Sequence, residues 1–174
     1  MQRIAAMAMM AALLLIGWAF AQAPSKSKIP DDIAVSGPEI ARTRATGDQI
    51  YTWQAESKTW KLKAPEATFG GGGVQGKHYA GPTWEEDDGS KVVGRKLVEH
   101  ASPDADAIPW LLLEATSHDG AGVFDKVTFI QRIRTVGGNP PSTPGSKDGE
   151  EVRVHYGATY VFYGAGATTH PVGK

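Results

Sequence analysis

Apolar and polar residues alternate along most of the chain beyond residue 47, and a period of two is typical of half-buried β-strands. The clearest alternating runs are 49–53, 59–63, 90–98, 123–136 and 151–163. The first two runs lie close together, which predicts a hairpin, and Pro65 is expected to end its second strand. In the last run, one face carries the residues Val152, Val154, Tyr156, Ala158, Tyr160 and Phe162.

Residues 108–113 (IPWLLL) form the most apolar run after the N-terminal segment. The run is too short for a globular helix and contains a proline, so it predicts a strand that is buried on both faces. No long helix is indicated after the N-terminus. We therefore expect residues 48–165 to fold as a single-domain antiparallel β-sandwich or barrel, followed by a tail at 166–174.

The N-terminus has the pattern of a secretory signal peptide at residues 1–21. Arg3 supplies positive charge, an apolar run follows, and Ala19 and Ala21 form a small-residue cleavage site. We expect a periplasmic or secreted protein with no membrane span after cleavage, whose residues 22–47 form an extended arm. The alternative is a retained membrane anchor, although the apolar run is barely long enough to span a bilayer.

Composition narrows the range of functions. The chain has no cysteine, which excludes disulfides, thiolate metal sites and cysteine nucleophiles. Its net charge of -1 argues against nucleic acid as a partner, since phosphate binding needs a basic surface.

Sequence motifs leave the cofactor unknown. There is no nicotinamide-dinucleotide fingerprint and no nucleotide-binding loop. Residues 71–77 have the glycine and lysine spacing of a phosphate loop, but His78 stands where Ser or Thr should hold magnesium, and no helix is expected to follow. We interpret this segment as a hairpin loop.

Titratable residues gather around the stretch 77–94 and the turn that follows residue 117. The candidates for catalysis are His78, Glu85, Asp88 and His118, and the candidates for metal binding are His78, His118 and Asp119. Imidazoles and carboxylates are the usual ligands of zinc or manganese when thiols are absent. The alternative is that these polar residues only form turns. A third possibility is a catalytic triad of Ser90, His118 and either Asp104 or Asp119, but no sequence motif positions the serine.

Aromatic and basic residues suggest ligand binding. Tyr79, Trp84, Asp119 and Arg132 are the candidate binding residues, since exposed aromatics beside acids suit a glycan and arginine can hold a carboxylate. Trp84 is expected to be exposed because it follows a Gly-Pro turn, whereas Trp110 is expected in the core. Arg132 either holds an anion or simply faces solvent outside the sheet.

Several runs together resemble the DUF3455 family of exported bacterial and fungal proteins of uncharacterised function. These runs are residues 78–84 (HYAGPTW), 88–90 (DGS), 108–113 (IPWLLL), 130–132 (IQR), 135–138 (TVGG) and 158–163 (ATYVFY). The similarity covers about residues 47–163 and implies a fold family and an export route, not a reaction. Some fungal members carry a malate dehydrogenase label, which this sequence does not support because it lacks βαβ alternation.

The resemblance also implies one difference. Many members of the family have a cysteine near the position of Trp53 and another near Ser146, and both are absent here. If these cysteines pair in relatives, this chain lacks a crosslink worth about 2–4 kcal/mol. The loop at 138–149 is then expected to be looser than in those relatives.

Two functions remain open at this point. The first is a non-catalytic binding or structural protein of the cell envelope or extracellular space, with a glycan or another envelope component as its partner. The second is a metal-dependent or acid/base hydrolase that uses the histidines and acids of residues 78–119.

Overall fold

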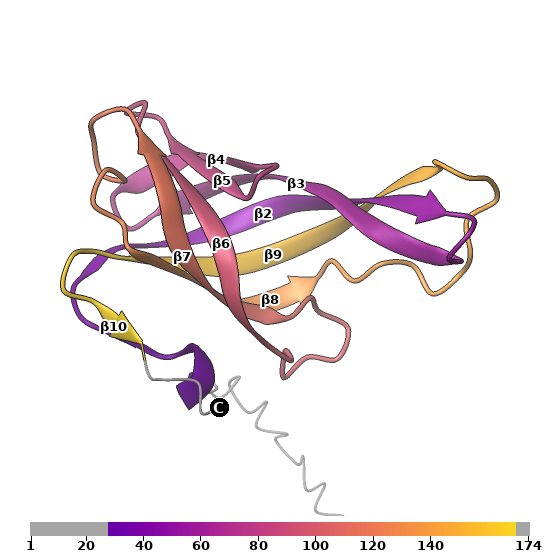
Figure 1. Ribbon diagram of the computed structural model, residues 1–174, viewed down its shortest axis with the longest axis horizontal. Helices are drawn as coiled ribbons and strands as arrows, with labels where there is room; N and C mark the ends of the chain where they lie inside the picture. Colours follow the sequence, from indigo (N-terminus) through magenta and orange to yellow (C-terminus); the bar gives the residue numbers. More distant parts are fainter. Residues whose placement is uncertain (1–27, 170–174) are drawn as a thin grey trace, which may run out of the picture.

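The computed structural model describes residues 28–169, and in this part of the chain almost all regular structure is antiparallel β-strand. Eight strands form one sheet that closes into a barrel (Figure 1). In barrel order they are β2 (Glu39–Gln54), β3 (Thr59–Gly71), β4 (Val74–Tyr79), β5 (Thr83–Glu86), β6 (Lys91–His100), β7 (Trp110–Asp119), β8 (Phe129–Gly137) and β9 (Glu151–Tyr163). The predicted all-β antiparallel fold is confirmed, in its barrel form.

The barrel closes because β2 pairs with β3 along one edge and with β9 along the other. Each of the other strands pairs with its neighbours in the chain, as short turns between antiparallel strands require. Full closure removes the free sheet edges that would otherwise expose unpaired backbone groups.

Strand β2 begins at Glu39, inside the segment that the sequence pattern assigned to the arm. Its first half alternates exposed Arg42 and Arg44 with buried Ala41, Thr43 and Ala45. Residues this small give only a weak apolar signal, so the alternation is easily overlooked. They are nevertheless the inward-facing side of a barrel strand.

Strand β3 also runs further than expected, because it continues through Pro65 to Gly71. Pro65 pairs with Gln49, directly beside a register shift between Ile50 and Tyr51. A proline is tolerated next to such an irregularity because the ladder there does not need its missing N–H. The prediction that Pro65 ends the strand was therefore wrong.

Gly72 and Gly73 join β3 to β4 in a two-residue turn, with φ values of 67° and 84°. This is the left-handed backbone that tight hairpins require and that glycine adopts without strain. The glycine-rich segment is thus a hairpin loop, as predicted, and the strand β4 follows it rather than a helix.

The barrel wall is apolar on both sides. The interior holds most of the core, whose members are Ala41, Ala45, Ala67, Phe69, Val74, Trp84, Val92, Ile108, Leu113, Phe124, Val127, Ile130, Tyr156, Ala158, Tyr160 and Phe162. A smaller cluster lies outside the wall and contains Ile33, Trp110, Leu112, Ile133, Val161 and Tyr163. The run 108–113 is consequently buried on both faces, as predicted.

An N-terminal segment covers the outer cluster. It contains the short 3-10 helix η1 (Asp31–Ile33) and strand β1 (Val35–Ser36), which pairs with β10 (Thr168–Thr169). Gln131 on β8 fixes the segment, because its amide donates to the Ile33 carbonyl while its oxygen accepts a hydrogen bond from Tyr163. The predicted signal peptide and the last five residues lie outside the described part of the chain.

Strands β2, β3 and β9 extend well beyond the barrel body, and the loop between β8 and β9 runs beside the projecting β2–β3 hairpin (Figure 1). Trp60 donates its indole N–H to the Thr143 carbonyl of this loop. Gly145 packs so tightly on Trp53 that a Cβ there would lie 2.5 Å from the indole Cγ. The loop is therefore held against the β2–β3 hairpin through Trp53 and Trp60. Between residues 28 and 169, no helix is long and apolar enough to cross a membrane.

We predict that the N-terminal segment contributes substantially to stability. Ile33→Ala should lower the free energy of unfolding by about 3 kcal/mol, because Ile33 is fully buried and the substitution leaves a cavity. Urea denaturation measures this. Val136→Thr, at a residue that is 63% exposed, is the control and should change stability by less than about 0.5 kcal/mol. Equal effects of both substitutions would show that the segment is not docked on the barrel.

Candidate ligand cavity

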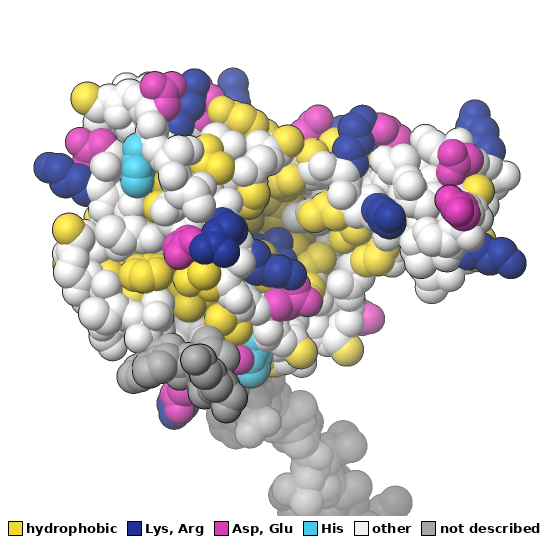
Figure 2. All heavy atoms as spheres, viewed as in Figure 1, with side chains coloured by type: hydrophobic (Ala, Val, Ile, Leu, Met, Phe, Trp, Pro, Cys, Tyr) yellow, Lys and Arg dark blue, Asp and Glu magenta, His cyan; other side chains and the backbone are white. Residues whose placement is uncertain are grey.

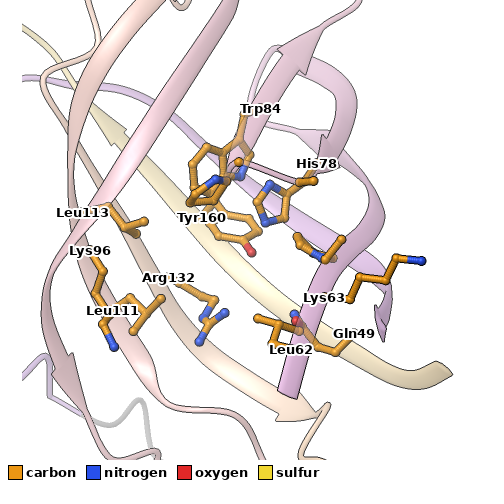
Figure 3. Close-up of a pocket in the computed structure, with 15 residues that line it drawn as sticks. Gln49, Leu62, Lys63, His78, Trp84, Lys96, Leu111, Leu113, Arg132 and Tyr160 are labelled. Carbon is orange, nitrogen blue, oxygen red and sulfur yellow. The ribbon is translucent and has the colours of Figure 1, made fainter. Parts of the chain in front are cut away.

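The barrel interior is not completely filled. A cavity of about 230 Å³ remains, and strands from opposite sides of the barrel line it (Figure 3). Its lining residues are Gln49, Leu62, Lys63, Ala64, Pro65, His78, Ala80, Gly81, Pro82, Trp84, Lys96, Leu111, Leu113, Arg132 and Tyr160. In the surface view, a hollow lined by hydrophobic side chains and edged by basic ones lies between the barrel body and the projecting hairpin (Figure 2).

His78 forms part of the cavity wall from strand β4 and is almost completely buried, with 3% of its surface exposed. Its ring stacks on Trp84, with centroids 4.3 Å apart and an interplanar angle of 11°, and meets the edge of Tyr160 at 5.2 Å. Its Nδ1 lies 2.8 Å from the Thr83 carbonyl oxygen. Because a carbonyl can only accept, Nδ1 carries the proton, and Nε2 of the neutral ring is an acceptor.

Burial lowers the pKa of His78 to about 3, an effect that the hydrogen bond to Thr83 only partly offsets and that the nearby charge of Arg132 reinforces. His78 is therefore neutral at physiological pH. It shapes the cavity and offers one acceptor nitrogen.

Arg132 enters the cavity from strand β8. Figure 3 shows its guanidinium group pointing inward, between Leu111 and Gln49. Its Nε and Nη2 both donate to the Pro109 carbonyl oxygen, at 3.1 and 2.8 Å. Among residues 28–169, no carboxylate forms an ion pair with Arg132, although Lys63 and Lys96 are paired with Glu151 and Glu99.

The wall also contains two buried N–H donors that have no partner within the described chain. They are Nε2 of Gln49 and Nε1 of Trp84, in side chains that are only 1% exposed. Leaving such a donor unsatisfied costs about 1–3 kcal/mol. The two unpaired N–H donors therefore line the same cavity as Arg132, whose charge has no carboxylate partner within the described chain.

Asp88 and His118, two of the predicted catalytic residues, lie elsewhere and hold the loop between β7 and β8. We call residues 120–128 the plug loop, because its residue Phe124 is fully buried in the barrel core and packs on Phe162 at 4.5 Å. Asp88 accepts the Val123 N–H at 2.9 Å, and His118 contacts the Val127 carbonyl through Nε2 at 2.8 Å.

Hydrogen bonds from Ser90 and Val123 lower the pKa of Asp88 to about 2. The hydroxyl of Ser90, the serine of the triad interpretation, accepts the Phe124 N–H at 3.1 Å. Asp88, Ser90 and His118 thus hold the plug loop, which contributes Phe124 to the core.

Tyr79, Glu85 and Asp119 form a third group on the barrel surface, around Lys91. Tyr79 donates its hydroxyl to Glu85 at 2.7 Å, and this hydrogen bond raises the pKa of Tyr79. Lys91 lies 3.8 Å from Glu85 and 3.9 Å from Asp119. None of these three candidates lines the cavity.

The predicted residues are therefore divided among three places. His78, Trp84 and Arg132 meet at the cavity, Asp88 and His118 at the plug loop, and Tyr79, Glu85 and Asp119 on the surface. His78 and His118 are separated by two intervening strands, a distance of about 14 Å at the usual strand spacing. Within residues 28–169, no group of three His, Asp or Glu side chains could hold a metal ion.

One expectation about a single residue was wrong, and one of the two alternatives for Arg132, exposure to solvent outside the sheet, does not hold. Trp84 is 1% exposed rather than exposed, because its strand β5 turns it into the barrel. Arg132 faces the interior rather than solvent, because it shares its strand face with the core residue Ile130. Trp110 is buried as expected, with 1% of its surface exposed.

Sequence reasoning missed Gln49, Leu62 and Lys96 as cavity residues. Gln49 was read as the polar position of an alternating run, yet it is buried. The available signal was on β8, where Arg132 shares a strand face with the apolar residue Ile130.

Fold and cavity together define the class of protein: an all-β protein with a closed eight-stranded barrel and a small, largely apolar cavity that opens to the surface. The family model described as "Protein of unknown function (DUF3455)" matches residues 69–164, and the chain belongs to this family. No curated protein and no solved structure was found to match the chain.

We predict that burial of His78 makes stability depend on pH. The pKa of His78 is about 3 in the folded protein, below the unfolded value of about 6.5. The contribution of His78 to the free energy of unfolding is therefore complete above pH 6.5 and is lost as the pH falls towards 3. Between pH 7.5 and 5, the wild type should lose about 2 kcal/mol from this residue.

Urea denaturation at both pH values measures this loss. His78→Gln should remove most of the pH dependence, whereas His155→Gln, at an imidazole that is 74% exposed, should retain the loss that comes from His78. Equal pH dependence in all three proteins would contradict the burial of a neutral His78.

Proposed function

We propose that the protein is an exported, non-catalytic binding protein of the cell envelope or extracellular space, and that it holds a small, mostly apolar molecule in the barrel cavity. The observation that carries this proposal is the cavity itself. It is concave and lined largely by aliphatic and aromatic side chains with a few polar groups, as ligand sites usually are.

The positions of the titratable residues favour binding over hydrolysis. Nδ1 of His78 is occupied by a carbonyl, and no acid lines the cavity within the described chain. The acids and the second histidine that a hydrolase would need hold the plug loop or lie on the surface.

A small molecule is also favoured over a surface glycan. A sugar ring stacks on an exposed aromatic face, but Trp84 is buried and His78 already covers one of its faces. Export rests on the signal-like pattern of residues 1–21 and is part of the proposal.

The test uses N-phenyl-1-naphthylamine, an uncharged dye that becomes fluorescent in apolar sites. We expect saturable binding of one dye per chain, together with displacement by 1-octanol. Leu62→Ser should weaken dye binding about five- to tenfold, because Leu62 contributes apolar surface at the cavity while remaining 52% exposed, so that the fold should tolerate the change.

Val136→Ser is the matched control, since Val136 is exposed and does not line the cavity. It should bind the dye like the wild type. Absence of saturable binding, or equal binding by both variants, would overturn the proposal. Secretion of the full-length chain fused to a reporter, and its loss when residues 1–21 are deleted, tests the export part.

A further inference from the structure

We infer that the ligand of the cavity carries a carboxylate, and that Arg132 binds this group. The inference rests on the proposed binding function and specifies its ligand: an amphipathic monocarboxylic acid with an apolar body.

The charge in the cavity is not balanced. The lining includes Lys63, Lys96 and Arg132, and it contains no Asp or Glu within the described chain. Both lysines have carboxylate partners that lie outside the cavity lining, so one positive charge remains. A half-buried charge without a counter-ion is costly, and a monoanion would compensate it.

The geometry of Arg132 leaves suitable donors free. A guanidinium group has five N–H bonds, and the Pro109 carbonyl takes one from Nε and one from Nη2. Nη1 and the second hydrogen of Nη2 remain at the tip of the group, which points into the cavity near the Tyr160 hydroxyl (Figure 3). Two parallel N–H bonds fit the two oxygens of a carboxylate. The bond to Pro109 holds the fork in position, which reduces the entropy lost on binding.

The surroundings of Arg132 suit the rest of such a ligand. The donor Nε2 of Gln49 is buried and unpartnered in the same wall, so a ligand oxygen could also satisfy it. Leu62, Leu111 and Leu113 provide apolar surface around the guanidinium group. The cavity thus offers one position for an anion beside apolar surface.

The experiment compares octanoate with 1-octanol as competitors of N-phenyl-1-naphthylamine at pH 7. The two have the same chain length and differ in the charged group. Octanol is the more apolar compound, so a purely apolar cavity would prefer it. We expect the wild type to prefer octanoate about tenfold, the effect of a charge-assisted hydrogen-bonded pair.

Arg132→Met should reverse the preference in favour of octanol while retaining dye binding. Arg134→Met is the matched control, because it removes the same charge from an exposed position on the same strand, and it should preserve the octanoate preference. Arg132→Lys should retain only part of it, because an ammonium group lacks the planar fork. Circular dichroism and dye affinity show whether each variant is folded.

The outcomes separate the two proposals. If the wild type binds the dye but does not prefer octanoate, or if Arg132→Met keeps the preference, the carboxylate inference is wrong and the binding function stands. Tighter binding of octyl phosphate than of octanoate would overturn the carboxylate in favour of another anion. If neither dye nor octanoate binds, both proposals fail.

Discussion

Pairing of β2 with both β3 and β9 is the constraint on which the rest of the structure depends. It turns a meander of antiparallel strands into a closed wall and gives each inward-facing side chain partners across the interior. The closed wall fixes the volume of the interior, so the volumes of the inward-facing side chains decide how completely it is filled. Small residues such as Ala41 and Ala45 on β2 leave space, and aromatic residues such as Tyr160 and Phe162 on the neighbouring β9 fill much of the interior. The cavity lies where this filling is incomplete.

The cavity combines features that do not serve stability alone. A cationic Arg132 inside an apolar barrel is costly, and its anchoring to the Pro109 carbonyl fixes its orientation without neutralising its charge. Burial keeps His78 neutral, so it adds an acceptor but no second charge. A core selected only for stability would favour apolar residues of similar size at these positions. These polar groups are the ones that the proposed ligand would contact.

Many of the residues that suggested catalysis in the sequence have another physical role. Asp88, Ser90 and His118 are grouped because the plug loop between β7 and β8 packs against the turn between β5 and β6 and needs partners for its backbone groups. Their hydrogen bonds hold Phe124 in the core. Side-chain types at turns are therefore ambiguous, since the same carboxylates and imidazoles that bind metals also satisfy backbone N–H and C=O groups.

The sequence by itself determined the fold class, the family resemblance and the strand with two buried faces, because a period of two and an uninterrupted apolar run are local signals. Its pattern also placed Ile130 and Arg132 on one side of a strand, and Tyr160 with Phe162 on one side of another. Only the tertiary structure decided which of these sides faces the interior, since that depends on barrel closure and on the N-terminal segment that covers the outer cluster. It likewise separated His78 from His118 and brought Arg132 to His78 and Gln49, because distances between strands far apart in the chain follow from pairing and register.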